Sequence, residues 1–189
     1  IIIIMTTSFI RIIIVFHFIR QAMGLQQMPP NQVLVGLTLF LTFFIMQPTI
    51  NNILEEGINP YLDQEINRTE FFERIEQPMK KFMLKQTKTK DLELFLEASK
   101  TEPPKSRNDI SIWTVLPAYT LSEITQGFEI GIIIFIPFIM IDMIVATVLM
   151  SLGMMMLPPV MISLPFKVLL FVMVDGWELL IEGLIKSFN

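Results

Sequence analysis

Residues 128–152 read FEIGIIIFIPFIMIDMIVATVLMSL, and this almost continuously apolar stretch decides the fold. It is longer than the ~20 apolar residues that a helix needs to cross a bilayer. A second apolar stretch, residues 160–174, follows after the connection 153–159. Each stretch contains a proline, Pro137 or Pro165, which kinks a helix and frees a carbonyl that needs a partner in neighbouring protein. We therefore predict a kinked helical hairpin that packs against other helices.

The N-terminal part of the chain predicts another hairpin. Its first apolar stretch covers residues 1–19, and its second covers residues 33–46, or 33–54 if it extends further. Met28-Pro29-Pro30-Asn31 between them is typical of a turn. The chain begins at Ile1 with a run of isoleucines, which we interpret as a start partway through a hydrophobic element.

Composition limits the classes of protein to which the chain can belong. Hydrophobic residues make up 52% of its 189 residues and the mean hydropathy is +0.60, so we expect a membrane protein or a buried subunit. The net charge of −4 argues against nucleic acid as a partner. The absence of cysteine excludes disulfides and thiolate metal sites, and a single histidine, His17, excludes sites built from several imidazoles.

Charge is concentrated in the middle of the chain, where 10 of the 14 basic and 12 of the 18 acidic residues lie between positions 51 and 110. Apolar residues at helical spacing predict short amphipathic helices there. The expected helices cover residues 69–75, 79–84 and 91–98, with breaks at Asn59-Pro60, Gln77-Pro78 and Pro103-Pro104 and an exposed loop over 99–109. We predict an all-α chain with an N-terminal hydrophobic hairpin (1–50), a polar helical middle (51–112) and a C-terminal hydrophobic hairpin (113–189).

Several stretches carry a specific resemblance. Residues 116–131 read LPAYTLSEITQGFEIG and residues 137–143 read PFIMIDM, and both are similar to signatures of the FliP/SctR family. Residues 5–34, residues 82–87 and the stretch from Ser163 to Trp177 resemble the same family. The tip MMMLPP, residues 154–159, resembles the flagellar members.

The resemblance implies an all-α, multi-pass subunit of the type III protein export gate in the bacterial inner membrane, at the flagellar basal body. In this family about five copies assemble helically with FliR and FliQ into a hetero-oligomer, on which FlhB docks. Unfolded export substrates pass through the gate. Much of the apolar surface is then buried between subunits and not in lipid, and membrane lipid is a further partner. The resemblance puts region 51–110 on the periplasmic side and implies neither catalytic activity nor a cofactor, so we assign no catalytic, cofactor-binding or metal-binding residue.

Seven of the 14 methionines lie between Met140 and Met161. Methionine is unbranched and soft, so a ring of such side chains around a pore could seal against ions and still part for an unfolded chain. The resemblance points to this gasket role for Met154, Met155 and Met156. Composition alone favours the simpler interpretation, in which methionines fill gaps in a core.

Asp142 lies inside an apolar stretch, where a charge costs several kcal/mol unless it is paired or hydrated. Lys167 is the only basic residue in the facing stretch. Counted from the turn of an antiparallel hairpin, the two differ in height by ~4–5 Å at 1.5 Å per residue, so an intramembrane ion pair is within reach. The alternative is a proton-relay role for Asp142. Asp175, near the end of its stretch, is expected to reach water.

Two acidic residues, Glu123 and Glu129, precede or begin the third apolar stretch. Charges at subunit borders set register, so we predict that Glu123 pairs with a lysine of a neighbouring copy, with Lys88 as the first choice. The alternative is a solvated charged face without a partner. Arg11 is expected to face protein or to reach the interface, and His17 is expected to be buried and hydrogen-bonded.

Three glycines, Gly127, Gly131 and Gly153, permit close helix packing or tight turning. Two functions compete with the export gate. A small-solute or proton-coupled transporter would use Asp142 as a relay and broken helices as a binding site. A membrane-bound hydrolase has little support, because the chain has one histidine, no cysteine and no glycine-rich phosphate loop.

Overall fold

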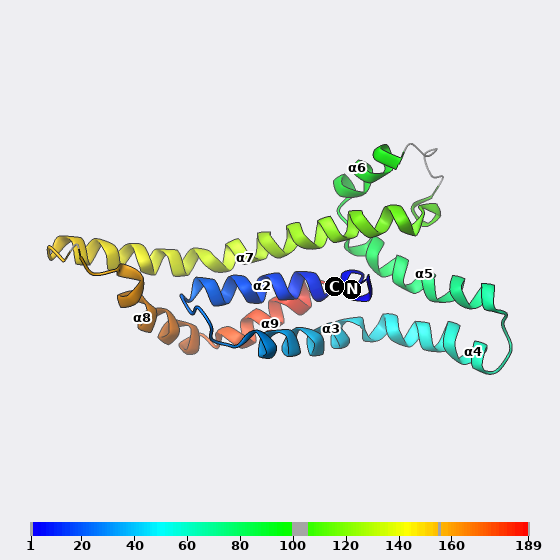
Figure 1. Cartoon of the computed structure of the whole chain (residues 1–189), viewed down its shortest axis with the longest axis horizontal. Coiled ribbons are helices and arrows are strands. Elements are labelled where there is room, and N and C mark those ends of the chain that lie inside the picture. Colours follow the sequence, from blue (N-terminus) through cyan, green and yellow to red (C-terminus); the bar gives the residue numbers. More distant parts are fainter. Residues whose placement is uncertain (1, 100–105, 155, 189) are drawn as a thin grey trace. The chain divides into compact units, whose positions relative to one another are not determined.

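The computed structural model describes residues 2–99, 106–154 and 156–188, and within these ranges every regular element is a helix (Figure 1). The all-α prediction is therefore confirmed for the described part of the chain. The elements in chain order are α1 (Ile2–Met5), α2 (Phe9–Ala22), α3 (Asn31–Ile53), a π-helical turn (Leu54–Ile58), α4 (Asn59–Leu62), α5 (Arg68–Gln86), α6 (Thr89–Ser99), a 3₁₀ turn (Arg107–Asp109), α7 (Ile112–Ser151), α8 (Pro159–Met173) and α9 (Gly176–Lys186).

The chain forms two compact units, which cut across the three sequence regions that we expected. The first unit comprises residues 1–11 and 39–126, and the second comprises residues 12–38 and 127–189. The long helices α3 and α7 contribute residues to both units, because neither helix ends where the composition of the sequence changes.

Helix α3 is longer than its apolar stretch predicts. Backbone helicity continues from Asn31 through the π-helical turn to Leu62 without a break. The break that we expected at Asn59-Pro60 is wrong. Pro60 removes one backbone donor from this continuous run, and the carbonyl of Glu56, four residues before it, accepts a hydrogen bond from Nη1 of Arg74 at 3.3 Å instead.

Helix α5 likewise runs through a proline, Pro78, where we expected two separate helices. Its N-terminus is fixed by a capping box, in which the Asn67 side chain accepts hydrogen bonds from the amides of Thr69 (2.9 Å) and Glu70 (3.0 Å). The Glu70 carboxylate accepts the Asn67 N–H in return, at 3.2 Å. Such a cap satisfies donors that a helix start leaves open and offsets the bond lost at the proline.

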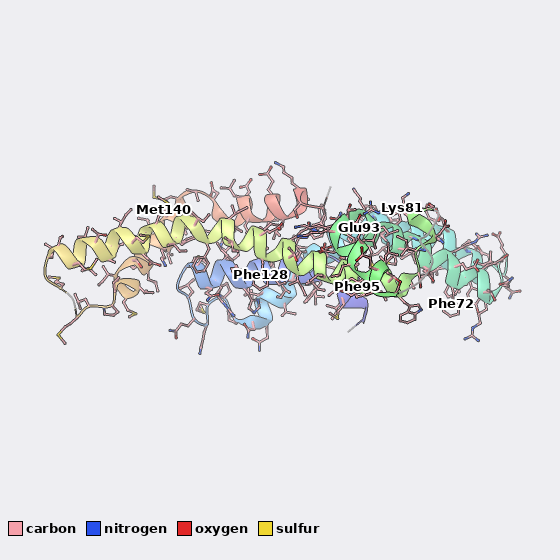
Figure 2. The ribbon with its side chains drawn as sticks, turned by 90° about the horizontal axis from the view of Figure 1, so that it is seen from above. Phe72, Lys81, Glu93, Phe95, Phe128 and Met140 are labelled. Carbon is pink, nitrogen blue, oxygen red and sulfur yellow. The ribbon has the colours of Figure 1, made fainter. Side chains whose placement is uncertain are left out.

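The core of the first unit lies where α5, α6 and the start of α7 meet (Figure 1). Phe82 of α5 meets Tyr119 of α7 edge-to-face, with ring centroids 6.1 Å apart. Phe95 of α6, labelled in Figure 2, packs against the same cluster. The buried members of the cluster are Met83, Leu84, Leu92, Ile110, Val115, Ala118 and Tyr119.

In the second unit α2 packs along α7, and two glycines of α7 allow the close approach (Figure 1). A Cβ atom added at Gly127 would lie 3.1 Å from Ile14, and one added at Gly131 would lie 2.5 Å from the Phe18 ring. The Phe18 ring also meets Phe128 edge-to-face, with centroids 5.1 Å apart. The two glycines thus serve helix packing within the chain.

Helix α9 follows α8 after a sharp turn and packs back onto α2. Asp175 adopts a left-handed backbone (φ 51°) at this turn, and its side chain is exposed. A Cβ atom at Gly176 would lie 2.3 Å from the Phe171 ring, so the turn needs glycine there. Trp177 meets Phe171 and Phe16 edge-to-face, with centroids at 5.2 and 6.5 Å.

Two helices in the described part are long and apolar enough to cross a membrane, namely Asn31–Leu62 and α7, and α8 is a shorter apolar helix. The most apolar window of α7 is only 11% buried within the chain. With 40 residues, α7 is about 60 Å long, roughly twice the thickness of the hydrocarbon core. A single crossing of a bilayer therefore leaves about half of α7 outside the hydrocarbon.

Replacing Gly131 with alanine should destabilise the second unit, because the new Cβ would overlap the Phe18 ring. We expect the free energy of unfolding to fall by about 1–3 kcal/mol, the usual cost of overpacking. Thermal unfolding of the purified protein in detergent measures the change.

Gly183→Ala is the matched control, since a Cβ atom there meets nothing within 4 Å. It should be neutral or slightly stabilising, because alanine favours a helix over glycine by about 1 kcal/mol. Equal midpoints for the two variants would show that α2 and α7 are not in close contact at Gly131.

Candidate functional site: the α7–α8 hairpin and its buried ion pairs

The connection from α7 to α8 is a glycine-capped turn. Gly153 has a φ of +72°, its N–H bonds to the carbonyl of Met150 (3.0 Å), and the N–H of Met154 bonds to the carbonyl of Leu149 (2.9 Å). This pair of bonds ends a helix and satisfies its last carbonyls. A Cβ atom at Gly153 would meet nothing within 4 Å, so this glycine provides the turn and not a helix contact.

The two described methionines of this turn, Met154 and Met156, are exposed and lie outside the chain's own core. Met156 is 99% exposed and Met154 is 48% exposed. Met155 lies outside the described residues. Met150 and Met161, on the flanking helices, are also exposed. Met154 and Met156 therefore do not fill a gap inside this chain, and they are available to contact something else.

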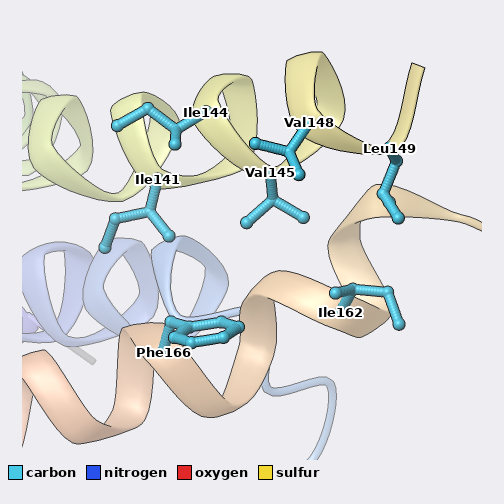
Figure 3. Close-up of a pocket in the computed structure, with 7 residues that line it drawn as sticks. All are labelled: Ile141, Ile144, Val145, Val148, Leu149, Ile162 and Phe166. Atoms are coloured by element: carbon cyan, nitrogen blue, oxygen red, sulfur yellow. The ribbon is translucent and has the colours of Figure 1, made fainter. Parts of the chain in front are cut away.

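An apolar groove separates α7 from α8 near the turn (Figure 3). Its volume is about 430 Å³ and only apolar side chains line it. Ile141 and Val145 of α7 face Phe166 of α8 across the gap. The groove starts beside Asp142 and extends to Leu149, so the end of the hairpin is loosely packed.

A polar cluster joins the two helices at Asp142. The Lys167 Nζ lies 2.6 Å from Oδ2 of Asp142, and the hydroxyl of Ser163 donates to Oδ1. Lys167 and Ser163 are buried, and the side chain of Asp142 is 29% exposed. The structure thus places the two charges that we paired from the sequence in contact.

Lys167 also binds α2, a contact that sequence reasoning missed. Its Nζ donates to the carbonyl of Ala22 at 3.1 Å. Gly24, with a φ of +76°, caps α2. Its N–H donates to the carbonyl of Gln21, and the N–H of Leu25 donates to the carbonyl of Arg20. The Ala22 carbonyl is therefore left for a partner outside the helix. A cation at a helix C-terminus is stabilised by the helix dipole.

The sequence position of Ser163 could have predicted that it joins Lys167 in contacting Asp142. Ser163 precedes Lys167 by four residues, which places both on one face of α8. The hydroxyl and the ammonium group therefore reach the two oxygens of one carboxylate. The contact with Ala22 could not be predicted in this way, because its acceptor is a backbone carbonyl, which every residue has.

A second buried ion pair lies in the first unit. Both Arg11 and Glu123 are fully buried, and the guanidinium contacts both carboxylate oxygens, with Nε 3.1 Å from Oε2 and Nη2 bonded to Oε1. Nη2 also donates to the Gln86 side chain at 3.1 Å. Two parallel bonds from an arginine to a carboxylate are stronger and more directional than a single contact.

This geometry corrects our expectation for Glu123. We expected a lysine of a neighbouring copy, or a solvated face, but Glu123 pairs with Arg11 of its own chain. The partners are 112 residues apart, so local spacing could not reveal the pair. The backbone amide of Lys88 donates to the Ser122 hydroxyl (3.0 Å), which donates to the buried Asp91 carboxylate (2.6 Å).

Two further candidate residues, Glu129 and His17, lie on the surface of the second unit. Glu129 is exposed on α7. His17 is exposed as well, contrary to our expectation, because it lies off the face of α2 that buries Ile12 and Phe16. Its Nδ1 donates to the carbonyl of Ile13 at 2.9 Å. Within the described ranges, no three acidic, histidine or cysteine side chains gather as they would around a metal ion.

The FliP family model matches residues 1–184. The chain belongs to the FliP family. It is 54% identical to the flagellar biosynthetic protein FliP of Bacillus subtilis over 187 residues, which cover 99% of this chain and 85% of that protein. The proteins of the same name from Caulobacter vibrioides and Aquifex aeolicus are 50% and 47% identical over 100% of this chain, covering 71% and 80% of their own lengths.

For this FliP-family chain, Arg11→Met should be strongly destabilising, because it leaves the Glu123 carboxylate buried without a cation. Removing one partner of a buried pair costs about 3–5 kcal/mol. We expect little folded protein in membranes, measured as detergent-extractable protein and its unfolding midpoint. The double variant Arg11→Met with Glu123→Leu should recover part of the loss, since no charge is then left alone.

Lys186→Met is the control for charge removal. Lys186 pairs with Glu182 at 2.6 Å, but both side chains are largely exposed. Exposed pairs contribute less than about 1 kcal/mol, so stability should hardly change. If Arg11→Met is as mild as Lys186→Met, the pair with Glu123 is not buried in the working protein.

The Asp142–Lys167 contact predicts coupling in a double-mutant cycle. Asp142→Asn and Lys167→Gln should each lower the unfolding midpoint, and the double variant should be milder than the sum by at least about 1 kcal/mol. Additive losses would contradict the pair. If Asp142→Asn leaves assembly intact and stops transport, the proton-relay role is correct instead.

Proposed function

We propose that this chain is a pore-forming core subunit of the flagellar type III protein export gate, which passes unfolded substrates across the bacterial inner membrane. The observation that carries the proposal is the exposure of Met154 and Met156 at the end of the α7–α8 hairpin. Side chains of this kind, turned away from their own chain, are suited to line a passage shared with other subunits.

The comparisons support the flagellar process. The relatives from three distant bacteria all carry the name flagellar biosynthetic protein FliP, and each matches this chain over nearly its whole length. This chain is 47–54% identical to each of them, and we infer that it takes part in building the flagellum. The place of action that we propose is the basal body.

The surface of α7 supports assembly with other proteins. Large apolar side chains are exposed at Trp113 near its start, and again from Ile124 through Phe128 and Met140 (Figure 2) to Met150. Because the helix is about twice as long as the hydrocarbon core, lipid can cover only part of this surface. Protein partners must cover the rest, since contiguous apolar patches of this size are rarely left in water.

The partners that we propose are further copies of this chain, about five in all, together with FliR and FliQ, with FlhB docked on the assembly. A helical arrangement of copies would place the α7–α8 turns around one axis. No catalytic step is needed for such a conduit, and we propose that the chain has no enzymatic activity or cofactor of its own.

The seal of the closed pore would consist of methionine side chains from each copy at Met154, Met155 and Met156. Methionine has three rotatable side-chain bonds and a polarisable sulfur, so it fits irregular gaps and repacks at low cost. A ring of such groups excludes hydrated ions and yields to an unfolded chain of any sequence. The glycine at position 153 and the apolar groove behind it leave the turn free of rigid packing.

The competing transporter function has less support. A relay at Asp142 must take up and release a proton, but this carboxylate accepts bonds from both Lys167 and Ser163. Protonation would leave the buried ammonium without its counter-ion, which is unfavourable in an apolar surrounding. A structural role for Asp142 follows more directly from these contacts.

Changing Met154, Met155 and Met156 together to alanine should make the assembled gate leak ions, because the shorter side chains cannot close the passage. Conductance of the purified complex in planar bilayers, or depolarisation of cells that carry the variant, measures the leak. Met28→Ala is the control, since Met28 is exposed in the connection between α2 and α3 and outside the hairpin.

The control should stay as tight as the unaltered protein. A triple variant that assembles normally and conducts no more than the control would show that the methionines do not form the seal.

A further inference from the structure

The charges of the first unit fall into two segments of opposite sign. Residues 51–77, the acidic segment, carry seven acidic and two basic side chains and so have a formal charge of −5. Residues 78–90, the lysine segment, carry five lysines and no acidic residue and so have a formal charge of +5. The acidic segment covers the end of α3, the π-helical turn, α4 and the first half of α5, and the lysine segment covers the second half of α5 and the start of α6.

Most of the acidic groups and lysines of these two segments are exposed. In the part of the chain that the structure describes, none of the exposed ones forms an ion pair. On α5, Glu73 and Lys81 are separated by about 12 Å along the helix, which is too far for direct contact. The exposed members are Glu55, Glu56, Asp63, Glu65, Glu70 and Glu73 of the acidic segment and Lys81, Lys85 and Lys90 of the lysine segment.

Some of these charges oppose the dipoles of their own helices. Asp63 directly follows the helical run Asn31–Leu62, at the end where a helix favours cations, and neither the π-helical turn nor α4 has a basic residue in its last turn. Lys90 lies in the first turn of α6, at the end where a helix favours anions. The stability of the helices therefore does not account for where these charges are placed.

The acidic segment also exposes large apolar side chains. Leu62 of α4 is 70% exposed and Phe72 of α5 is 57% exposed. Figure 2 shows Phe72 at the outer end of α5 and Lys81 further along the same helix. Exposed apolar groups rimmed by charged ones are typical of a surface that binds another protein.

We propose that the acidic segment of one copy of this chain binds the lysine segment of a second copy, with Glu56 and Asp63 opposite Lys81 and Lys85. The contact rests on the proposed function, in which several copies assemble, and it assigns the surfaces that join them. It uses a different surface on each copy, so copies add in series. A neighbour displaced along α5 brings the separated charges together, as a helical arrangement of copies does.

A second copy matches the two segments better than other occupants do. An unrelated cationic protein would neutralise the acidic segment and leave the lysines without partners. Anionic lipid headgroups would neutralise the lysines and leave the carboxylates. A second copy neutralises both with the same pair of surfaces in every contact, and complementary charges of this kind set partner choice and register.

The test reverses the charges of each surface in the purified protein in detergent. Glu56→Lys with Asp63→Lys should lower the association constant between copies at least about tenfold, which corresponds to 1.4 kcal/mol, because like charges then face one another. Lys81→Glu with Lys85→Glu should do the same. The chain that carries all four substitutions should regain association, since its surfaces are again opposite in charge. Native mass spectrometry over a dilution series measures the number of copies.

The unfolding midpoint separates a lost contact from a lost fold. Glu56→Lys with Asp63→Lys brings cations to the C-terminal end of a helical run, so the midpoint should not fall while association does. Glu178→Lys with Glu182→Lys is the matched control, because it reverses two exposed carboxylates of α9 outside the first unit. This control should associate like the unaltered protein.

Three results would overturn the proposal. The first is a four-substitution chain that associates no better than the two double variants. The second is weaker association on reversal of the lysines alone, which would assign them to another anionic partner. The third is normal association of every variant, which would leave the proposed function intact and place the contact between copies elsewhere. An unaltered protein that never associates, alone or with its partners, would instead overturn the proposed function and this contact together.

Discussion

One ammonium group, that of Lys167, connects three helices of the second unit. Lys167 contacts the Asp142 carboxylate of α7 and the Ala22 carbonyl at the end of α2, and it projects from α8. Each partner supplies negative charge or a negative dipole end, so the buried cation is compensated from two sides. Loss of any one would leave a polar group unpaired in apolar surroundings, which costs more than the contact itself contributes.

The first unit also buries a cation and compensates its charge, with different groups. Arg11, on the first turn of α2, is buried against Glu123 of α7 and Gln86 of α5, so a charge inside an apolar segment again fixes where segments distant in sequence meet. The planar guanidinium suits this place, because its N–H groups bind a carboxylate side-on and an amide oxygen together. Together with the close approach at Gly127 and Gly131, such polar contacts select one register of α2 on α7.

The sequence predicted the features that depend on local residue spacing, or on two residues lying at similar distances from a turn. The apolar stretches predicted the helices, and Asp142 and Lys167 were paired because they lie at similar distances from the methionine turn. It failed at Pro60 and Pro78, since a helix continues through a proline where other contacts compensate for the lost bond, here the Arg74 guanidinium on the Glu56 carbonyl and the capping box of α5. It also failed at Glu123, because Arg11 is far away along the chain and several lysines lie closer. Even when an acidic residue is expected to be buried, the sequence does not show which cation it pairs with.

Between the Lys167 cluster and the turn, the two helices of the hairpin carry no charged residue. Residues 143–151 of α7 and 159–162 of α8 carry no charge, and Thr147 and Ser151 bond only to carbonyls of their own helix within the described part of the chain. Contacts there are apolar and without direction, and the open groove shows that even these are incomplete. The end of the hairpin can therefore shift without breaking a polar contact, while the ion pair at its base resists the same displacement. A loosely packed tip on a fixed base follows from where the charges are placed, and it is the mechanical property that the proposed methionine seal would require.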